Sequence, residues 1–212
     1  MCGLLPLLIV SMLFLATSVP GCIKNRNLPL DGGHLITNDQ EVHWEPEYFP
    51  LPVLIDKNMP VHLIEGVYTA INVWNISTGV AVFEPVLVDP LQSLPADCGW
   101  IAAVERPLDN DGLWTSLEKP GTGQLCAGEV ALSVGTLHKY SAKLWMHELG
   151  HGLGLAHDHG DRRSIMYPTV YSDSPQYIMP DDAVSVRSMV LGSFVPMSAG
   201  LKSRLYKFLE AL

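Results

Sequence analysis

The sequence is poor in basic residues and has no long basic run. Its 212 residues include 13 lysines and arginines against 22 aspartates and glutamates, which gives a formal net charge of −9 at pH 7. A surface that binds the phosphate backbone of nucleic acids needs the opposite balance, so we expect no nucleic-acid partner. Hydrophobic residues make up 48% of the chain. This content indicates a globular protein with one sizeable domain rather than a disordered chain.

Long hydrophobic runs are missing except at the N-terminus. Residues 4–19 are uncharged and apolar, but the run contains Pro6 and is short for a membrane span, which favours a signal peptide. Two cleavage interpretations remain open. Ala16-Thr17-Ser18 suits an ordinary signal peptidase, whereas Val19-Pro20-Gly21-Cys22 resembles a bacterial lipobox that would leave Cys22 lipid-modified. We therefore expect an exported protein, secreted or held at a bacterial cell envelope, with membrane contact only through that lipid anchor.

Cysteine is scarce as well, with four in the whole chain. Cys2 lies in the signal segment and Cys22 at its end, so Cys98 and Cys126 are the only pair inside the mature domain. In an exported protein such a pair usually forms a disulfide, and we predict that bridge. The alternative is two separate buried thiols.

The most informative stretch is residues 147–158, which read H-E-x-x-H-x-x-G-x-x-H-D. On a helix, His147 and His151 lie one turn apart on the same face, so both imidazoles can bind one zinc ion. Glu148 is then placed to act on a metal-activated water as general base and acid rather than as a ligand.

A glycine, a third histidine and a methionine turn complete this pattern. Gly154 has no Cβ and can adopt the positive φ of a sharp reversal, which would bring His157 back to the metal as third ligand. The fourth position stays open to water, as in catalytic rather than structural zinc sites. Met166 follows within Ser164-Ile165-Met166-Tyr167-Pro168. Together these features resemble the metzincin signature, and the Met-Tyr-Pro turn most resembles the matrixin branch.

The resemblance to matrixins covers residues 42–192 and implies an α+β, zincin-like fold. That fold has a twisted five-stranded mixed sheet, three main helices and an active-site cleft above the HExxH helix. The resemblance also implies an endopeptidase that acts on proteins or peptides with one catalytic zinc. Met166 would form an apolar floor beneath the histidines. Pro168 and Tyr171 would belong to the wall of the S1′ pocket.

The sequence departs from the matrixin pattern in several places. Asp158 is more like the reprolysin or snapalysin pattern, and we expect it to brace the turn at Gly154 through hydrogen bonds. Pro168 stands where astacin-like metzincins carry a zinc-binding tyrosine, so we predict no tyrosine ligand. No histidine lies between His62 and His138, so the histidine-rich loop of the matrixin structural zinc is absent or replaced. His138 and His159 are interpreted as surface residues.

Hydrophobic periodicity supplies the remaining elements. The expected strands are residues 52–56, 80–88, 99–104, 124–127 and 129–134, and the expected helices start after Pro60, at Ser141 as N-cap and at Asp181 or Asp182. Gly128 would mark a bulge or tight turn between the last two strands. By the matrixin resemblance, residues 124–127 would form the edge strand that pairs with an extended substrate.

The expected organisation has four parts. These are a signal peptide (1–22), a tether (23–41), the catalytic domain (42–192) and an amphipathic C-terminal helix (193–212). That helix packs on the domain or, alternatively, contacts a membrane or partner. Within the domain, Asp109 and Asp111 could give oxygens to calcium, although an Asx-type turn explains the same residues without an ion. We expect a monomer.

These features predict a metalloendopeptidase. The alternative is a catalytically weak or inactive zinc-containing binding or adhesion module of the same fold, and the presence of Glu148 argues against it. A purely structural zinc protein is a third class, disfavoured because three histidines leave one coordination position open.

Overall fold

The computed structural model describes residues 25–26, 36–37, 40–41, 43–89, 94–119, 122–171 and 173–192. The expected signal peptide (1–22) and C-terminal amphipathic helix (193–212) lie outside these residues, as does most of the expected tether (23–41). Within the described part, no helix is both long and apolar enough to cross a membrane.

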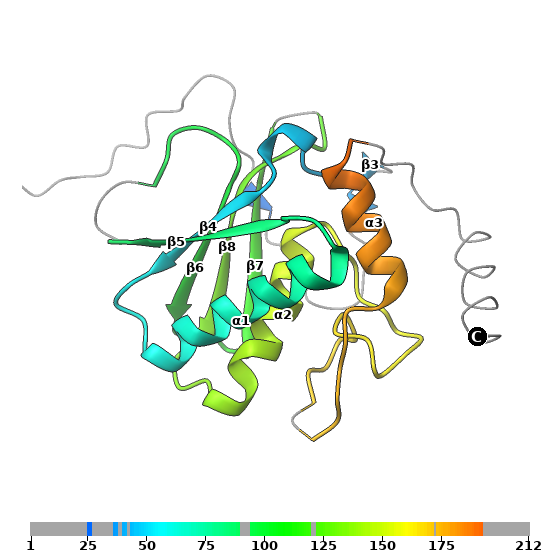
Figure 1. Cartoon of the computed structure of the whole chain (residues 1–212). Helices are drawn as coiled ribbons and strands as arrows, with labels where there is room; N and C mark the ends of the chain where they lie inside the picture. Colours follow the sequence, from blue (N-terminus) through cyan, green and yellow to red (C-terminus); the bar gives the residue numbers. More distant parts are fainter. Residues whose placement is uncertain are drawn as a thin grey trace, which may run out of the picture.

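A mixed sheet with the strand order β1-β7-β8-β6-β4-β5 runs through the domain (Figure 1). Its five long strands are β4 (Leu51–Asp56), β5 (Phe83–Val88), β6 (Trp100–Arg106), β7 (Gly112–Glu118) and β8 (Leu125–Ser133). β4, β5, β6 and β8 are parallel, while β7 runs antiparallel to β8. The two-residue strand β1 (Asn25–Arg26) pairs with the far end of β7. A separate two-stranded sheet joins β2 (Ile36–Thr37) to β3 (Gln40–Glu41).

Three helices complete the expected α+β architecture. They are α1 (Val61–Thr78), α2 (His138–Gly152) and α3 (Pro180–Val190), and a short 3-10 helix, η1 (Pro46–Tyr48), precedes β4. α1 and α2 lie side by side against one face of the sheet, and α3 packs against α1 (Figure 1). The five long strands and three helices confirm the predicted fold class.

The core lies between the sheet and α1 and α2, and three tryptophans with no exposed surface fill much of it: Trp44, Trp74 and Trp145. The indole N–H of Trp44 donates to the carbonyl of Gly152 at 2.7 Å, and that of Trp74 donates to the carbonyl of Met146 at 3.0 Å. Burial of an indole N–H is favourable when it finds such a partner, and both partners lie on α2. These bonds fix the helix that carries the zinc-site histidines.

The strand prediction around Gly128 was wrong. Residues 124–127 and 129–134 do not form two strands, because Gly128 lies inside the continuous strand β8. A Cβ there would collide with the indole ring of Trp114, which lies over the backbone from β7. The glycine therefore permits a close approach rather than a turn. The strand that the sequence analysis missed is β7 itself.

The helix starts also differ from their predictions. α2 begins three residues before Ser141, whose hydroxyl donates instead to the carbonyls of His138 and His62, at 3.0 and 3.2 Å. Ser141 thus faces α1 rather than capping α2. In α3, Pro180 and the two aspartates form the first turn. A proline at the first helical position and carboxylates near the helix N-terminus are both favourable there.

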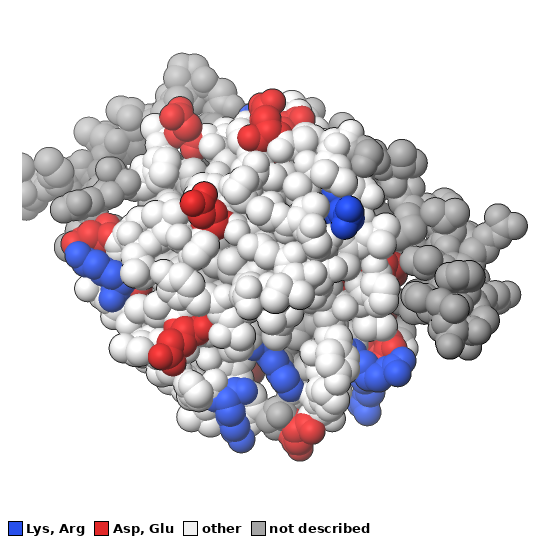
Figure 2. Space-filling view, in the orientation of Figure 1, with Lys and Arg blue, Asp and Glu red and all other residues white. Residues whose placement is uncertain are grey.

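The predicted disulfide is confirmed. Cys98 and Cys126 are joined at 2.07 Å, which ties the segment before β6 to the middle of the sheet. On the face shown in Figure 2, acidic and basic side chains are interspersed and form no extended basic patch. That distribution agrees with the overall acidic balance.

Candidate metal centre

The three histidines of the sequence motif converge. His147 and His151 lie in the last two turns of α2 and are almost completely buried. Gly154 adopts φ +87°, and the chain reverses there as predicted, which returns His157 to the helix. The Nε2 atoms of the three rings lie 3.1, 3.1 and 3.3 Å from one another.

The tautomers of His147 and His151 follow from the hydrogen bonds that their Nδ1 atoms make. Nδ1–H of His147 donates to the carbonyl of Ile165 at 2.6 Å, and Nδ1–H of His151 donates to the carbonyl of Leu155 at 2.9 Å. A carbonyl only accepts, so both Nε2 atoms carry lone pairs. Lone pairs at this distance repel each other unless a cation lies between them. Tetrahedral zinc with bonds of 2.0–2.1 Å would separate its nitrogen ligands by about 3.3 Å, so the donor set fits that ion.

Burial keeps the metal-facing histidines neutral. It lowers the pKa of His147 to about 4 and that of His151 to about 3. Burial also lowers the pKa of His157, with a smaller contribution from the nearby His159. Neutral imidazole is the form that binds metal, so all three rings are ready to act as ligands near neutral pH.

Glu148 follows His147 on α2, and its carboxyl group is not part of the group of potential ligand atoms. The side chain is 4% exposed, and its Oε2 has no hydrogen-bond partner in the described structure. Burial raises the pKa of Glu148 to about 8. The first residue of β7, Gly112, makes room for this carboxyl group, because a Cβ there would lie 2.5 Å from Oε1 of Glu148.

The segment after the third histidine packs against α2, the helix that carries His147 and His151. Met166 has no exposed surface, and its sulfur occupies the space where a Cβ of Gly150 would lie. Its carbonyl accepts from the amide of Asp158 at 2.8 Å, next to His157. The sequence pattern indicated Met166 but not Gly112, Gly150 or the carbonyl of Ile165. A glycine inside a helix, as at position 150, was the one available signal of a close approach.

Residues 101–190 match the family model described as matrixin, a peptidase family. This segment of the chain is therefore similar to matrixins. Among solved structures, it is similar to high choriolytic enzyme 1, a hatching-enzyme zinc protease from the medaka fish Oryzias latipes, with a TM-score of 0.36 and 16% identity. That match covers 59% of this chain and 55% of the other, so it spans about half of the medaka protein. No curated protein matches the sequence.

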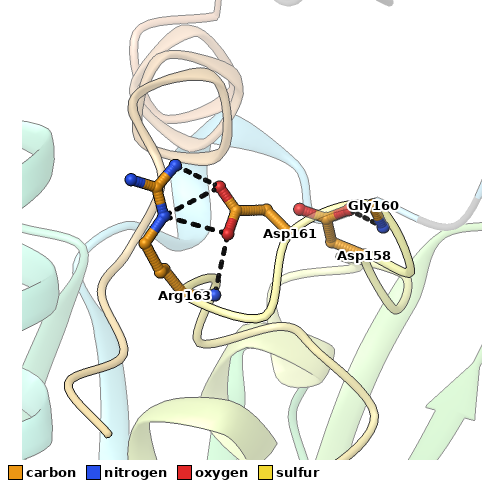
Figure 3. Close-up of polar contacts among 4 residues, drawn as sticks. All are labelled: Asp158, Gly160, Asp161 and Arg163. Atoms are coloured by element: carbon orange, nitrogen blue, oxygen red, sulfur yellow. Dashed lines mark hydrogen bonds and ion pairs between the residues drawn. The ribbon is translucent and has the colours of Figure 1, made fainter.

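The side chain of Asp158 contacts the loop that follows it rather than the turn at Gly154, where it was expected. Its Oδ1 accepts from the amide of Gly160 at 2.8 Å, while Asp161 forms an ion pair with Arg163 at 2.7 Å (Figure 3). The carboxylate of Asp158 thus orders the loop and does not orient an imidazole. Backbone carbonyls orient His147 and His151 instead.

The remaining predicted residues lie outside the group of three histidines. His138 and His159 are exposed, in agreement with their interpretation as surface residues. Asp109 and Asp111 are exposed in the loop before β7. Among the described residues, the histidine triad is the only group of three potential metal-ligating side chains. The calcium prediction therefore gains no support, since that ion needs six to eight oxygens.

The substrate-pairing strand was assigned to the wrong residues. Residues 125–127 belong to β8, which is paired on both sides, with β6 and with β7. The long strand at this border of the sheet is β7, and its first residue touches Glu148. Pro168 is exposed and Tyr171 partly exposed in the loop after the methionine turn.

Proposed function

We propose that this protein is a zinc-dependent endopeptidase. The observation that carries the proposal is the convergence of three Nε2 atoms beside a buried carboxyl group that has an unpartnered oxygen. His147, His151 and His157 would hold the metal, and Glu148 would stay free for proton transfer. The matrixin match supports this class of reaction and, with it, a protein or peptide substrate.

Proton transfer in the proposed reaction falls to Glu148. When bound, zinc polarises the scissile carbonyl and makes a water molecule more acidic. Glu148 accepts the proton of the attacking water and then donates it to the departing amine, so one group acts first as base and then as acid. Its burial supports the second role, because a desolvated carboxyl group holds a proton more readily than one in water. A nearby cation supports the first role by favouring the carboxylate.

Strand β7 offers a place for the substrate backbone. β1 pairs only with Ser116 and Leu117, so the outer edge of Gly112–Thr115 has no strand partner within the described residues. We propose that an extended peptide adds to this edge, with its scissile bond next to Glu148. Pro168 and Tyr171 would then lie on the wall that receives a substrate side chain.

The proposal is tested with purified protein. We expect about one zinc per chain and cleavage of an unfolded protein such as casein. Glu148→Gln should keep the zinc and lose the cleavage. Zinc binding without proteolysis across varied substrates would refute the enzyme and favour the zinc-containing binding module.

We also propose that the protein is exported. The disulfide between Cys98 and Cys126 supports export, because such bonds persist in oxidising compartments. Whether Cys22 carries a lipid is decided by labelling cells with a palmitate analogue. The absence of label on the protein would exclude the lipoprotein and leave ordinary signal cleavage.

A further inference from the structure

The loop that follows the methionine turn is tied down at its base. We call residues 167–171 and 173–176 the wall loop. Just outside it, the amide of Ile165 donates to the carbonyl of Tyr177, and the amide of Tyr177 donates to the carbonyl of Arg163, both at 2.7 Å. These two bonds close the loop next to the carbonyl that orients His147.

The interior of the wall loop is braced by one buried amide. Gln176 is 6% exposed. Its Nε2 donates to the carbonyls of Ser164 and Thr169, at 3.2 and 3.0 Å, and its Oε1 accepts from the amide of Tyr171 at 2.8 Å. A single side chain therefore connects both arms of the loop.

The outer part of the wall loop is tied to α2 by a lysine. Lys143 precedes His147 by one helical turn, so both side chains leave the helix on the same face. Its ammonium donates to the carbonyl of Tyr171 at 2.8 Å and to the carbonyl of Ser174 at 2.7 Å. One face of α2 thus carries both His147 and Lys143, the residue that holds the loop. In Figure 1 the chain between α2 and α3 runs beside α2, as this link requires.

We propose that Lys143 is a positioning residue that holds the wall loop at a fixed distance from α2 and so selects which substrate side chains fit beside the zinc site. The proposal rests on the peptidase function proposed above. Ordering a long lysine side chain is entropically costly, and the two short charge-assisted bonds offset that cost. Without them the two carbonyls lose their donor, and the outer part of the loop is free to move away from the helix.

Lys139 provides a matched control on the same helix. It lies one turn before Lys143 and its ammonium sits 4.7 Å from the ring centre of the neighbouring Tyr140. Lys139→Met removes the same charge from the same helix and leaves both carbonyl bonds of Lys143 to the wall loop in place. It also removes the attraction between its exposed ammonium and Asp173 of the loop, which the comparison with Lys143→Met takes into account. The variants to compare are therefore Lys143→Met and Lys139→Met, with Lys143→Arg as the conservative replacement.

The first measurement is selectivity between two peptides that differ only after the scissile bond, with alanine in one and phenylalanine in the other. Lys143→Met should change the ratio of their kcat/KM values by about fivefold or more, as the loss of a charged hydrogen bond implies. The change should appear in KM, with kcat and zinc content retained. Lys143→Arg should restore part of the wild-type ratio, and Lys139→Met should leave it unchanged.

The second measurement needs no turnover. Amide hydrogen exchange at Tyr171 should be faster in zinc-loaded Lys143→Met than in Lys139→Met, and the affinity ratio for two peptide hydroxamates bearing the same pair of side chains should shift with it. An unchanged affinity ratio in Lys143→Met overturns the proposal, whatever the exchange rates show. If the wild-type protein cleaves nothing, the peptidase function fails, and the hydroxamate ratio still decides the role of Lys143.

Discussion

One side of the zinc site is a helix end with a tight turn, and the other is an irregular loop. On the first side, the candidate ligands His147, His151 and His157 lie within eleven consecutive residues and are brought together by the helix period and by Gly154. On the second side, the wall loop depends on bonds from Gln176 and Lys143, which are distant in sequence from most of their acceptors. The first side is built by local geometry and the second by tertiary contacts.

This difference separates two kinds of failure. Damage to the local side should remove the metal or the proton transfer while the rest of the domain stays folded. Damage to the loop side should alter stability and substrate choice while the metal stays bound. Four predictions, ordered by the expected size of the effect, examine that separation.

The largest effect is expected from Glu148→Gln. Removal of the proton-transfer group should lower kcat by on the order of 10³-fold, within the range of general acid–base catalysis. Zinc content, measured by atomic absorption, should remain that of the wild type, because Glu148 lies outside the ligand group. Loss of zinc together with activity would mean that Glu148 is part of the ligand shell.

The second-largest effect is expected from acid, which should lower the stability of the side of the site that holds the histidines. The pKa values of His147 and His151 are lowered from 6.5 to about 4 and about 3, so the unfolded chain binds more protons than the folded one below pH 6.5. Stability present at pH 7 is then lost as the pH falls from 6.5 toward 4 and 3. Each of the two histidines should cost the metal-free protein about 1–2 kcal/mol between pH 7 and 5 in urea titrations. Glu148, whose pKa is raised to about 8, works in the opposite direction over this range and offsets part of that loss.

The same acid titration should also release zinc, since protonated imidazole cannot bind it. A His147→Asn, His151→Asn double variant, metal-free, is the control. It should not lose stability between pH 7 and 5, because the raised pKa of Glu148 then acts alone and favours the folded state toward acid. An equal pH dependence in both proteins would place the titrating groups elsewhere.

Gln176→Leu should act on the loop side. The change leaves the carbonyls of Ser164 and Thr169 and the amide of Tyr171 without their buried partner. Unsatisfied buried groups of this kind cost about 1–3 kcal/mol, which calorimetry would detect as a lower Tm. Lys143→Met is the comparison and should lower the Tm less, because one of its two bonds is exposed. Equal Tm values for Gln176→Leu and wild type would show that the loop does not depend on this amide.

The smallest effect is expected where β7 meets the helix. Gly112→Ala puts a methyl group 2.5 Å from Oε1 of Glu148, so the carboxyl group must shift. We expect kcat to fall by about tenfold, as misplacement of a catalytic group by a fraction of an ångström implies. Zinc content and Tm should stay close to wild type. Ser116→Ala on the same strand, outside the proposed substrate edge, serves as a control, and an equal loss of kcat in both variants would point to the strand rather than to Glu148.

Much of the fold followed from local patterns. Hydrophobic periodicity after Pro60 predicted α1, which ends at Gly79, where φ is +68°. The predictions of strand and helix boundaries failed at residues that are compatible with two different local structures. Gly128 suits a turn or a close approach, and only the position of Trp114 shows which one applies. Ser141 suits an N-cap or a helix–helix contact, and the proximity of His62 decides between them.

The sequence by itself determined the metal centre, because a helix repeats every 3.6 residues and a glycine permits the reversal that follows. Those two local rules are enough to bring His147, His151 and His157 together. Tertiary structure alone decided what surrounds them: Gly112 beside Glu148, the carbonyl of Ile165 on His147, and Lys143 on the wall loop. These contacts join segments that are brought together by packing, and no local spacing in the chain encodes them.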